Sequence, residues 1–188
     1  MSDIDVLESV LAKDEQLLAG IKQSQLGAAT QCPDYDVRAL ANHLVGWLEV
    51  FAAGANDRAF DGDPAAFATD DPAGDFRAAA SDTVAGWRAG GVDRKVRLTG
   101  SPMPGQLLLS MTLMEYTAHG CDLAVATGQP VPFSDDELTV ALKRARATLP
   151  DQYRGEGKAF ANVIEVAEDA PILDRFLGFM GRQPSAAH

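Results

Sequence analysis

The sequence is poor in the features that mark several large classes of protein. It has only two cysteines, Cys32 and Cys121, which are too few for a disulfide framework. No stretch approaches the roughly 18 apolar residues that a membrane-spanning helix requires. The first residues carry acids and lack a basic segment followed by an apolar one, so we expect no secretory signal. A soluble, cytoplasmic protein is therefore expected.

Positive charge is also scarce. Lys and Arg number 16 against 27 Asp and Glu, which gives a formal net charge of -11. Binding to phosphate backbones needs clustered Lys and Arg, so a nucleic-acid partner is not expected. With 46% hydrophobic and 23% charged residues, the chain is neither disordered nor fibrous and can bury a core. It contains no linker long enough to divide it, so residues 1–188 are expected to form a single domain.

Helical spacing of apolar residues dominates the chain. The strongest signal is the run VRALANHLVGWLEVFAAG, which begins at Val37 after a proline-containing break. The other expected helices cover residues 4–24, 76–88, 105–127, 134–149 and the terminal stretch ILDRFLGFMG. Residues 56–74 are rich in Asp, Gly and Pro and indicate a loop, while DRKVRLTG and residues 155–170 favour short extended pieces. The sequence thus predicts an all-α bundle with a short extended segment.

The expected helix over residues 105–127 has an unusual polar face. At 100° per residue from Glu115, His119 lies at about 40° and Asp122 at about -20°. Leu108 and Met111 share this face, and polar groups are costly to bury there unless a partner satisfies them. A carboxylate oxygen and an imidazole nitrogen four residues apart can reach one ion. Such pairs are also frequent on solvated helices, so the pair alone does not establish a metal site.

His43 strengthens the metal hypothesis. It lies at the flank of the apolar stripe of the helix that begins at Val37, where the alternative is a partly buried histidine bonded to a carbonyl or side chain. Of only three histidines, His188 is the last residue, and the other two occupy inward positions on separate helices. Metal sites in bundles form between facing helices. Two histidines and one carboxylate would leave an open coordination position, as in a catalytic metal site.

The remaining polar candidates have ordinary explanations. For Asp122, orienting a ligand histidine and a packing or capping role stay equally open. Cys32 is expected to be a small buried hydrophobe, because no neighbouring cation lowers its pKa, and Cys121 projects away from the metal face. Arg175 and Arg182 could meet an anionic substrate, but surface pairing with carboxylates is the favoured interpretation. The acidic loop lacks the spacing of an EF-hand calcium site.

Three stretches carry a resemblance to a known family: CPDYDVRALANHLVGW, EYTAHGCDLAVATGQP and DRFLGFMGRQP. They resemble the DinB/YfiT-like metal-binding bundle family, on the branch of the mycothiol-dependent maleylpyruvate isomerase N-terminal domain. The resemblance covers about residues 5 to 184. It implies a four-helix core with extra C-terminal elements and one divalent metal. By the same resemblance, His43, Glu115 and His119 match the family's ligands. Zinc is the first expectation, although nickel, iron and manganese accept this ligand set to some degree.

The resemblance also implies a function. Relatives act, or are proposed to act, as transferases and isomerases that use mycothiol or bacillithiol. We therefore expect a metal-dependent transferase or isomerase that acts on a small electrophile with a mycothiol-type thiol as cosubstrate. We expect this chain to lack the separate C-terminal domain of the full isomerase, so maleylpyruvate isomerization itself is not expected. The alternative is a non-catalytic metal or ligand-binding module with a regulatory role, because no second catalytic group stands out. The substrate and the oligomeric state stay open, although exposed bundle faces often form homodimers.

Overall fold

The computed structural model describes residues 2–98, 102–158 and 160–184. The α-helices of these residues are α1 (Asp3–Ala19), α2 (Val37–Ala55), α3 (Pro72–Gly90), α4 (Gly105–Thr127), α5 (Asp135–Thr148) and α6 (Ile172–Phe179). Short 3-10 turns are η1 (Gln23–Gln25), η2 (Pro64–Ala66) and η3 (Asp151–Tyr153). Two short strands, β1 (Lys95–Val96) and β2 (Met103–Pro104), pair antiparallel next to the start of α4. The all-α prediction is confirmed.

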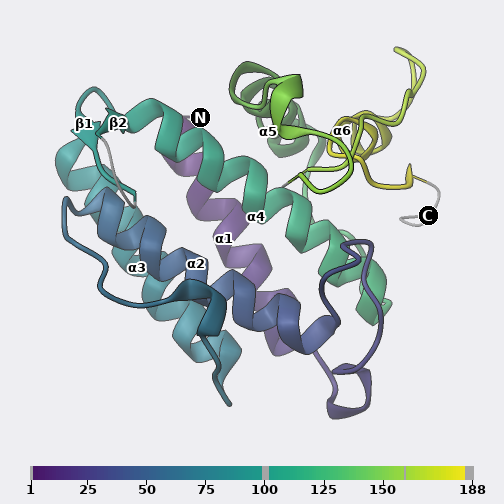
Figure 1. The fold of residues 1–188 in the computed structure, drawn as a ribbon, viewed down its shortest axis with the longest axis horizontal. Helices are drawn as coiled ribbons and strands as arrows, with labels where there is room; N and C mark the ends of the chain where they lie inside the picture. Colours follow the sequence, from purple (N-terminus) through teal and green to yellow (C-terminus); the bar gives the residue numbers. More distant parts are fainter. Residues whose placement is uncertain (1, 99–101, 159, 185–188) are drawn as a thin grey trace.

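Helices α1 to α4 lie side by side as a bundle, α5 packs against α4, and α6 packs against α5 (Figure 1). Within the bundle, α3 contacts α1 and α2, while α4 contacts α1, α2 and α5. The four-helix core with extra C-terminal helices therefore agrees with the expectation. Among the described residues, none of the helices is long and apolar enough to cross a membrane.

Side-chain caps fix several helix ends where the sequence indicated them. The carboxylate of Asp36 accepts the N–H of Ala39 at 2.8 Å and begins α2. Ser134 begins α5 with a capping box, in which its hydroxyl and the carboxylate of Glu137 each accept a backbone N–H. Gly128 ends α4 in the left-handed conformation, with φ 65, which glycine adopts without steric cost.

The first helix is shorter than expected. Its predicted span was 4–24, but α1 ends at Ala19 and the chain turns at Gly20. Gln129 occupies the space beside this turn: a Cβ on Gly20 would lie 2.2 Å from its Oε1, and its Nε2 donates to the carbonyl of Leu17 at 3.0 Å. The carbonyl of Leu17 also accepts the N–H of Gly20, so the Gln129 side chain, just after α4, adds a second hydrogen bond at the end of α1.

The third helix begins earlier than expected, inside the predicted loop 56–74. Asp71 caps α3 by accepting the N–H of Gly74 at 3.0 Å. Pro72 occupies the first helical position, where its missing N–H costs no hydrogen bond. The prediction of 76–88 therefore missed the first turn, because Asp and Pro signal both loops and helix starts.

Helix α4 is buried over most of its circumference because other helices pack on several sides of it. The hydroxyl of its buried Tyr116 donates to the carbonyl of Leu44 in α2 at 2.9 Å. The Tyr116 ring also packs edge-on against Phe51 of α2 and Phe76 of α3. These contacts fix the register of α4 against α2 one residue beyond Glu115.

Candidate metal centre

His43, Glu115 and His119 meet between α2 and α4. Nε2 of His43 and Nε2 of His119 each lie 3.2 Å from Oε1 of Glu115. One ligand atom from each residue lies within 4.8 Å of the others. The side chains are mostly buried, with 14%, 21% and 7% exposed for His43, Glu115 and His119. The structure therefore brings together the three side chains that the sequence singled out as ligands.

Local structure explains this convergence. Glu115 and His119 are four residues apart in α4, so they occupy one face of the helix. Leu40 and Leu44, on either side of His43 in the sequence, are fully buried and hold α2 against the bundle. His43 flanks these residues and faces α4.

The donor set fits a divalent metal. Imidazole nitrogen and carboxylate oxygen bind zinc at about 2.0–2.2 Å in tetrahedral geometry. Ligand atoms of such a site lie about 3.4 Å apart, and the two separations from Glu115 are close to that value. The same contacts are also suitable for N–H···O hydrogen bonds. Among the described residues, this is the one group of three or more His, Cys, Asp or Glu side chains arranged to hold an ion.

The charges of the cluster are strongly coupled. Burial alone would raise the pKa of the Glu115 carboxyl, but His119 and His43 hold it far below its usual range. Burial would lower the pKa of the His119 imidazole, yet Glu115 and Asp122 raise it to about 9. The site therefore holds an ionised Glu115 carboxylate beside a His119 imidazole that retains an extra proton. A bound metal cation would displace that proton.

Asp122 contacts the His119 ring at the nitrogen that does not face Glu115. Its Oδ2 lies 3.0 Å from Nδ1 of His119, so the Nε2 atom of the ring faces Glu115. The Asp122 side chain is completely buried. Of the two roles left open by the sequence, orienting the histidine agrees with this contact.

Arg182 also contacts Asp122. The sequence favoured an arginine paired with carboxylates at the surface, and this prediction was wrong for Arg182. Its Nη2 and Nε donate to Asp122 at 2.8 and 3.2 Å, and its Nη1 donates to the carbonyl of Met180. Only 10% of its side chain is exposed. The chain returns 60 residues after Asp122 to neutralise this buried carboxylate.

Tyr35 is a further residue that sequence reasoning missed. Its hydroxyl lies 2.9 Å from Nδ1 of His43, and the two rings pack with centroids 4.7 Å apart. The loop before α2 holds it there, because the hydroxyl of Thr30 donates to the carbonyls of Cys32 and Tyr35. Periodicity could not reveal this contact, since Tyr35 lies outside the helix.

The cysteines are poor nucleophiles in this environment. Cys32 is half-buried, and burial raises the pKa of its thiol although Arg182 opposes the shift. The sequence predicted a buried side chain without a neighbouring cation, but Cys32 is partly exposed and Arg182 acts on its thiol. Cys121 is fully buried, and its thiol pKa is raised well above the usual value. Neither thiol is primed to ionise at neutral pH.

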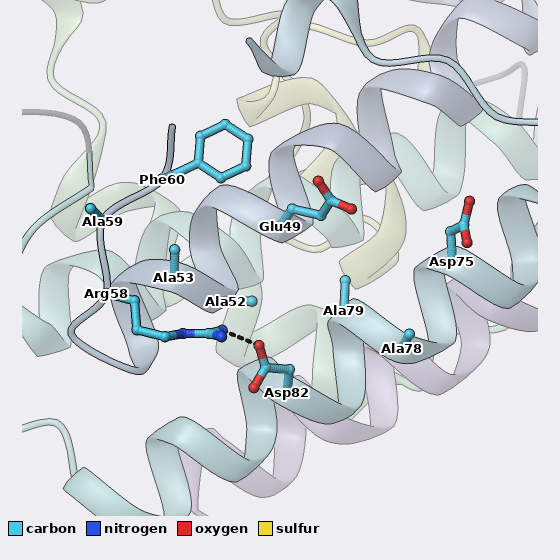
Figure 2. Close-up of a pocket in the computed structure, with 10 residues that line it drawn as sticks. All are labelled: Glu49, Ala52, Ala53, Arg58, Ala59, Phe60, Asp75, Ala78, Ala79 and Asp82. Carbon is cyan, nitrogen blue, oxygen red and sulfur yellow. Dashed lines mark hydrogen bonds and ion pairs between the residues drawn. The ribbon is translucent and has the colours of Figure 1, made fainter. Parts of the chain in front are cut away.

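A separate hollow of about 410 Å³ lies between α2, α3 and the loop after α2 (Figure 2). Alanines line much of it, and the carboxylates of Glu49 and Asp75 lie toward one end. At the other end Arg58 forms an ion pair with Asp82. None of its lining residues belongs to the histidine cluster.

Comparison with known proteins agrees with this architecture. Residues 9–124 match the family model described as the mycothiol maleylpyruvate isomerase N-terminal domain. Uncharacterized proteins from two strains of Mycobacterium tuberculosis are 31% identical over 166 residues, which cover 88% of this chain and 90% of theirs. The chain therefore belongs to this family, as the sequence resemblance predicted.

Two solved structures share the fold. A DinB-like protein from Bacillus cereus aligns with a TM-score of 0.52 and 17% identity, over 66% of this chain and 90% of that one. A mutant of the mycothiol-dependent maleylpyruvate isomerase aligns with a TM-score of 0.56 and 14% identity, over 84% of this chain and 72% of that one. At such identities the likeness concerns the fold.

Proposed function

We propose that this member of the mycothiol maleylpyruvate isomerase N-terminal domain family binds one divalent metal, zinc first, through His43, Glu115 and His119. We propose further that the whole chain acts as one domain that transfers a low-molecular-weight thiol to, or isomerises, a small electrophile. A mycothiol-type thiol is the proposed cosubstrate. The observation that carries the proposal is the convergence of two imidazoles and one carboxylate from α2 and α4 within 4.8 Å.

The residues of the site have distinct tasks in this proposal. A divalent metal would supply Lewis-acid chemistry that lowers the pKa of a thiol, so that the thiolate forms near neutral pH. His43 and His119 contribute neutral donors, and Glu115 contributes a negative charge. Asp122 keeps the Nε2 atom of His119 directed toward Glu115. These three side chains would hold the metal and would leave room for a small molecule to bind it.

Two observations favour external thiol chemistry over a protein nucleophile. Both cysteine thiols have raised pKa values because of burial, so neither is suited to attack an electrophile. The related isomerase is mycothiol-dependent by its name, which supports a small thiol as the sulfur source.

The first experiment is elemental analysis of protein purified without a histidine tag. We expect about one equivalent of metal, lost in His43→Ala and Glu115→Gln. Glu168→Gln serves as the matched control, because this glutamate is exposed and outside the cluster. Wild-type protein that takes up no zinc, nickel, iron or manganese would refute the proposal.

The second experiment measures thiol conjugation by the metal-loaded protein with mycothiol and a panel of small electrophiles. Turnover that disappears in His43→Ala and persists in Glu168→Gln would support a metal-dependent enzyme. Stoichiometric metal uptake without turnover for any thiol would instead favour the non-catalytic binding module.

A further inference from the structure

The two histidines of the cluster have different partners on their outer nitrogens. Nδ1 of His119 faces the Asp122 carboxylate, which accepts hydrogen bonds and cannot donate one when ionised. Nδ1 of His43 faces the hydroxyl of Tyr35 at 2.9 Å, and a phenol hydroxyl both donates and accepts. This difference determines which tautomers each ring can adopt.

In the structure, Nε2 of His43 lies 3.2 Å from Oε1 of Glu115. A carboxylate only accepts, so a neutral His43 that bonds to it carries its proton on Nε2. Nδ1 then holds the lone pair and accepts the O–H of Tyr35. Both polar ends of the ring are satisfied in this tautomer.

Metal ligation requires the opposite tautomer. A histidine that binds a metal through Nε2 uses the lone pair of that atom, so its proton moves to Nδ1. The Nδ1–H group then donates to Tyr35, whose oxygen accepts. His119 needs no such exchange, because Asp122 keeps the proton on Nδ1 throughout.

We propose that Tyr35 is the positioning residue of His43, and that its hydroxyl changes from hydrogen-bond donor to acceptor when a divalent cation binds. The inference rests on the metal site proposed above. Phenylalanine would preserve the ring packing but could satisfy neither tautomer, whereas the hydroxyl of tyrosine satisfies both.

The direct test is the tautomeric state of the histidines in protein labelled with ¹⁵N-histidine. Long-range ¹H–¹⁵N spectra are recorded for chelator-treated and zinc-loaded protein, above the ordinary imidazole pKa of about 6.5. We expect His43 to change from Nε2–H to Nδ1–H on zinc loading. His119, whose raised pKa of about 9 keeps both nitrogens protonated without metal, should lose only its Nε2 proton and keep Nδ1–H. Signals are assigned with His43→Gln. An Nδ1–H tautomer of His43 in both states would overturn the inference.

Variants test the same role through zinc affinity. Tyr35→Phe should weaken zinc binding about tenfold, the lower end of effects seen when a ligand histidine loses its partner. Tyr153→Phe is the matched control, because this tyrosine is 51% exposed and is not part of the cluster. Wild-type affinity in Tyr35→Phe would overturn the role of Tyr35. Absence of zinc uptake by the wild type would overturn the metal site itself. If Tyr35→Phe does not fold, the tautomers of the wild type decide.

Discussion

Replacing Asp122 tests the buried charges behind the candidate metal centre. The Asp122 carboxylate is completely buried and accepts hydrogen bonds from Arg182 and His119. Burial opposes its charge, but His119 and Arg182 keep the carboxyl pKa below its usual value. Asp122→Ala would leave the Arg182 guanidinium, 10% exposed, without its counter-charge. Removing one partner of a buried ion pair costs about 3–5 kcal/mol of stability. We therefore expect Asp122→Ala to lower the free energy of unfolding by about that amount.

A double-mutant cycle separates this effect from lost packing. Arg182→Met removes the charge and keeps a side chain of similar length. The double variant Asp122→Ala with Arg182→Met buries no unpaired charge, so it should lose less stability than the sum of the single variants. We expect a coupling free energy of about 2 kcal/mol or more from urea unfolding of the chelator-treated proteins. If the double variant loses as much unfolding free energy as the two single variants together, the reasoning is refuted.

The same variant has a separate consequence for the proposed metal site. Without Asp122, the Nδ1–H group of His119 loses its acceptor, and only the contact of Nε2 with Glu115 still orients the ring. We expect zinc affinity to fall about 10- to 100-fold, measured by competition with a chelator. Asp169→Ala, at an exposed carboxylate, should bind zinc as the wild type does. Unchanged zinc affinity in Asp122→Ala would contradict an orienting role.

Further predictions concern the crossing of α1 and α4. A Cβ on Gly120 would lie 2.2 Å from Oδ1 of Asp14 and 2.5 Å from Phe133, so Gly120→Ala should cost about 1–3 kcal/mol of unfolding free energy. Gly27→Ala, which meets nothing within 4 Å, is the control, and equal urea midpoints for the two variants would contradict the steric argument. Burial, and to a smaller extent Glu137, raises the carboxyl pKa of Asp14 well above its usual value. The contribution of Asp14 to stability is therefore fully present below the unfolded pKa of about 3.9, and it falls by up to about 1.4 kcal/mol per pH unit as pH rises toward the folded pKa. Asp14→Asn should reduce this dependence of stability on pH, measured from melting curves at a series of pH values. An equal pH dependence in the variant and the wild type would contradict the prediction.

Part of this site follows from the sequence because it depends on short-range geometry. The spacing of Glu115, His119 and Asp122 places them on one helical face whatever the surrounding fold. Predicting that His43 lies opposite them required one further assumption. Inward-facing histidines on separate helices of a bundle point into the same interior. The start of α2, the end of α4 and the start of α5 were predicted for a similar reason, since their caps lie next to them in the sequence.

The parts that escaped prediction depend on contacts between distant segments. Tyr35 reaches His43 because the loop before α2 folds back, and the Gln129 side chain, just after α4, bonds to the last turn of α1. No periodic pattern encodes either contact. Arg182 was assigned to the surface because arginines usually lie there, and its burial depends on a carboxylate 60 residues earlier.

The position of Arg182 has a consequence for the site as a whole. The family match ends at residue 124, so it contains His43, Glu115, His119 and Asp122 but not the arginine that neutralises Asp122. Without Arg182, only His119 would oppose the effect of burial, which raises the pKa of the Asp122 carboxyl, and protonation would weaken the hydrogen bond to the histidine. The segment after α6 thus supplies the charge that allows the matched residues to keep His119 oriented. The candidate ligands lie in the segment that matches the family model, whereas the charge that neutralises Asp122 comes from the C-terminal part of this chain.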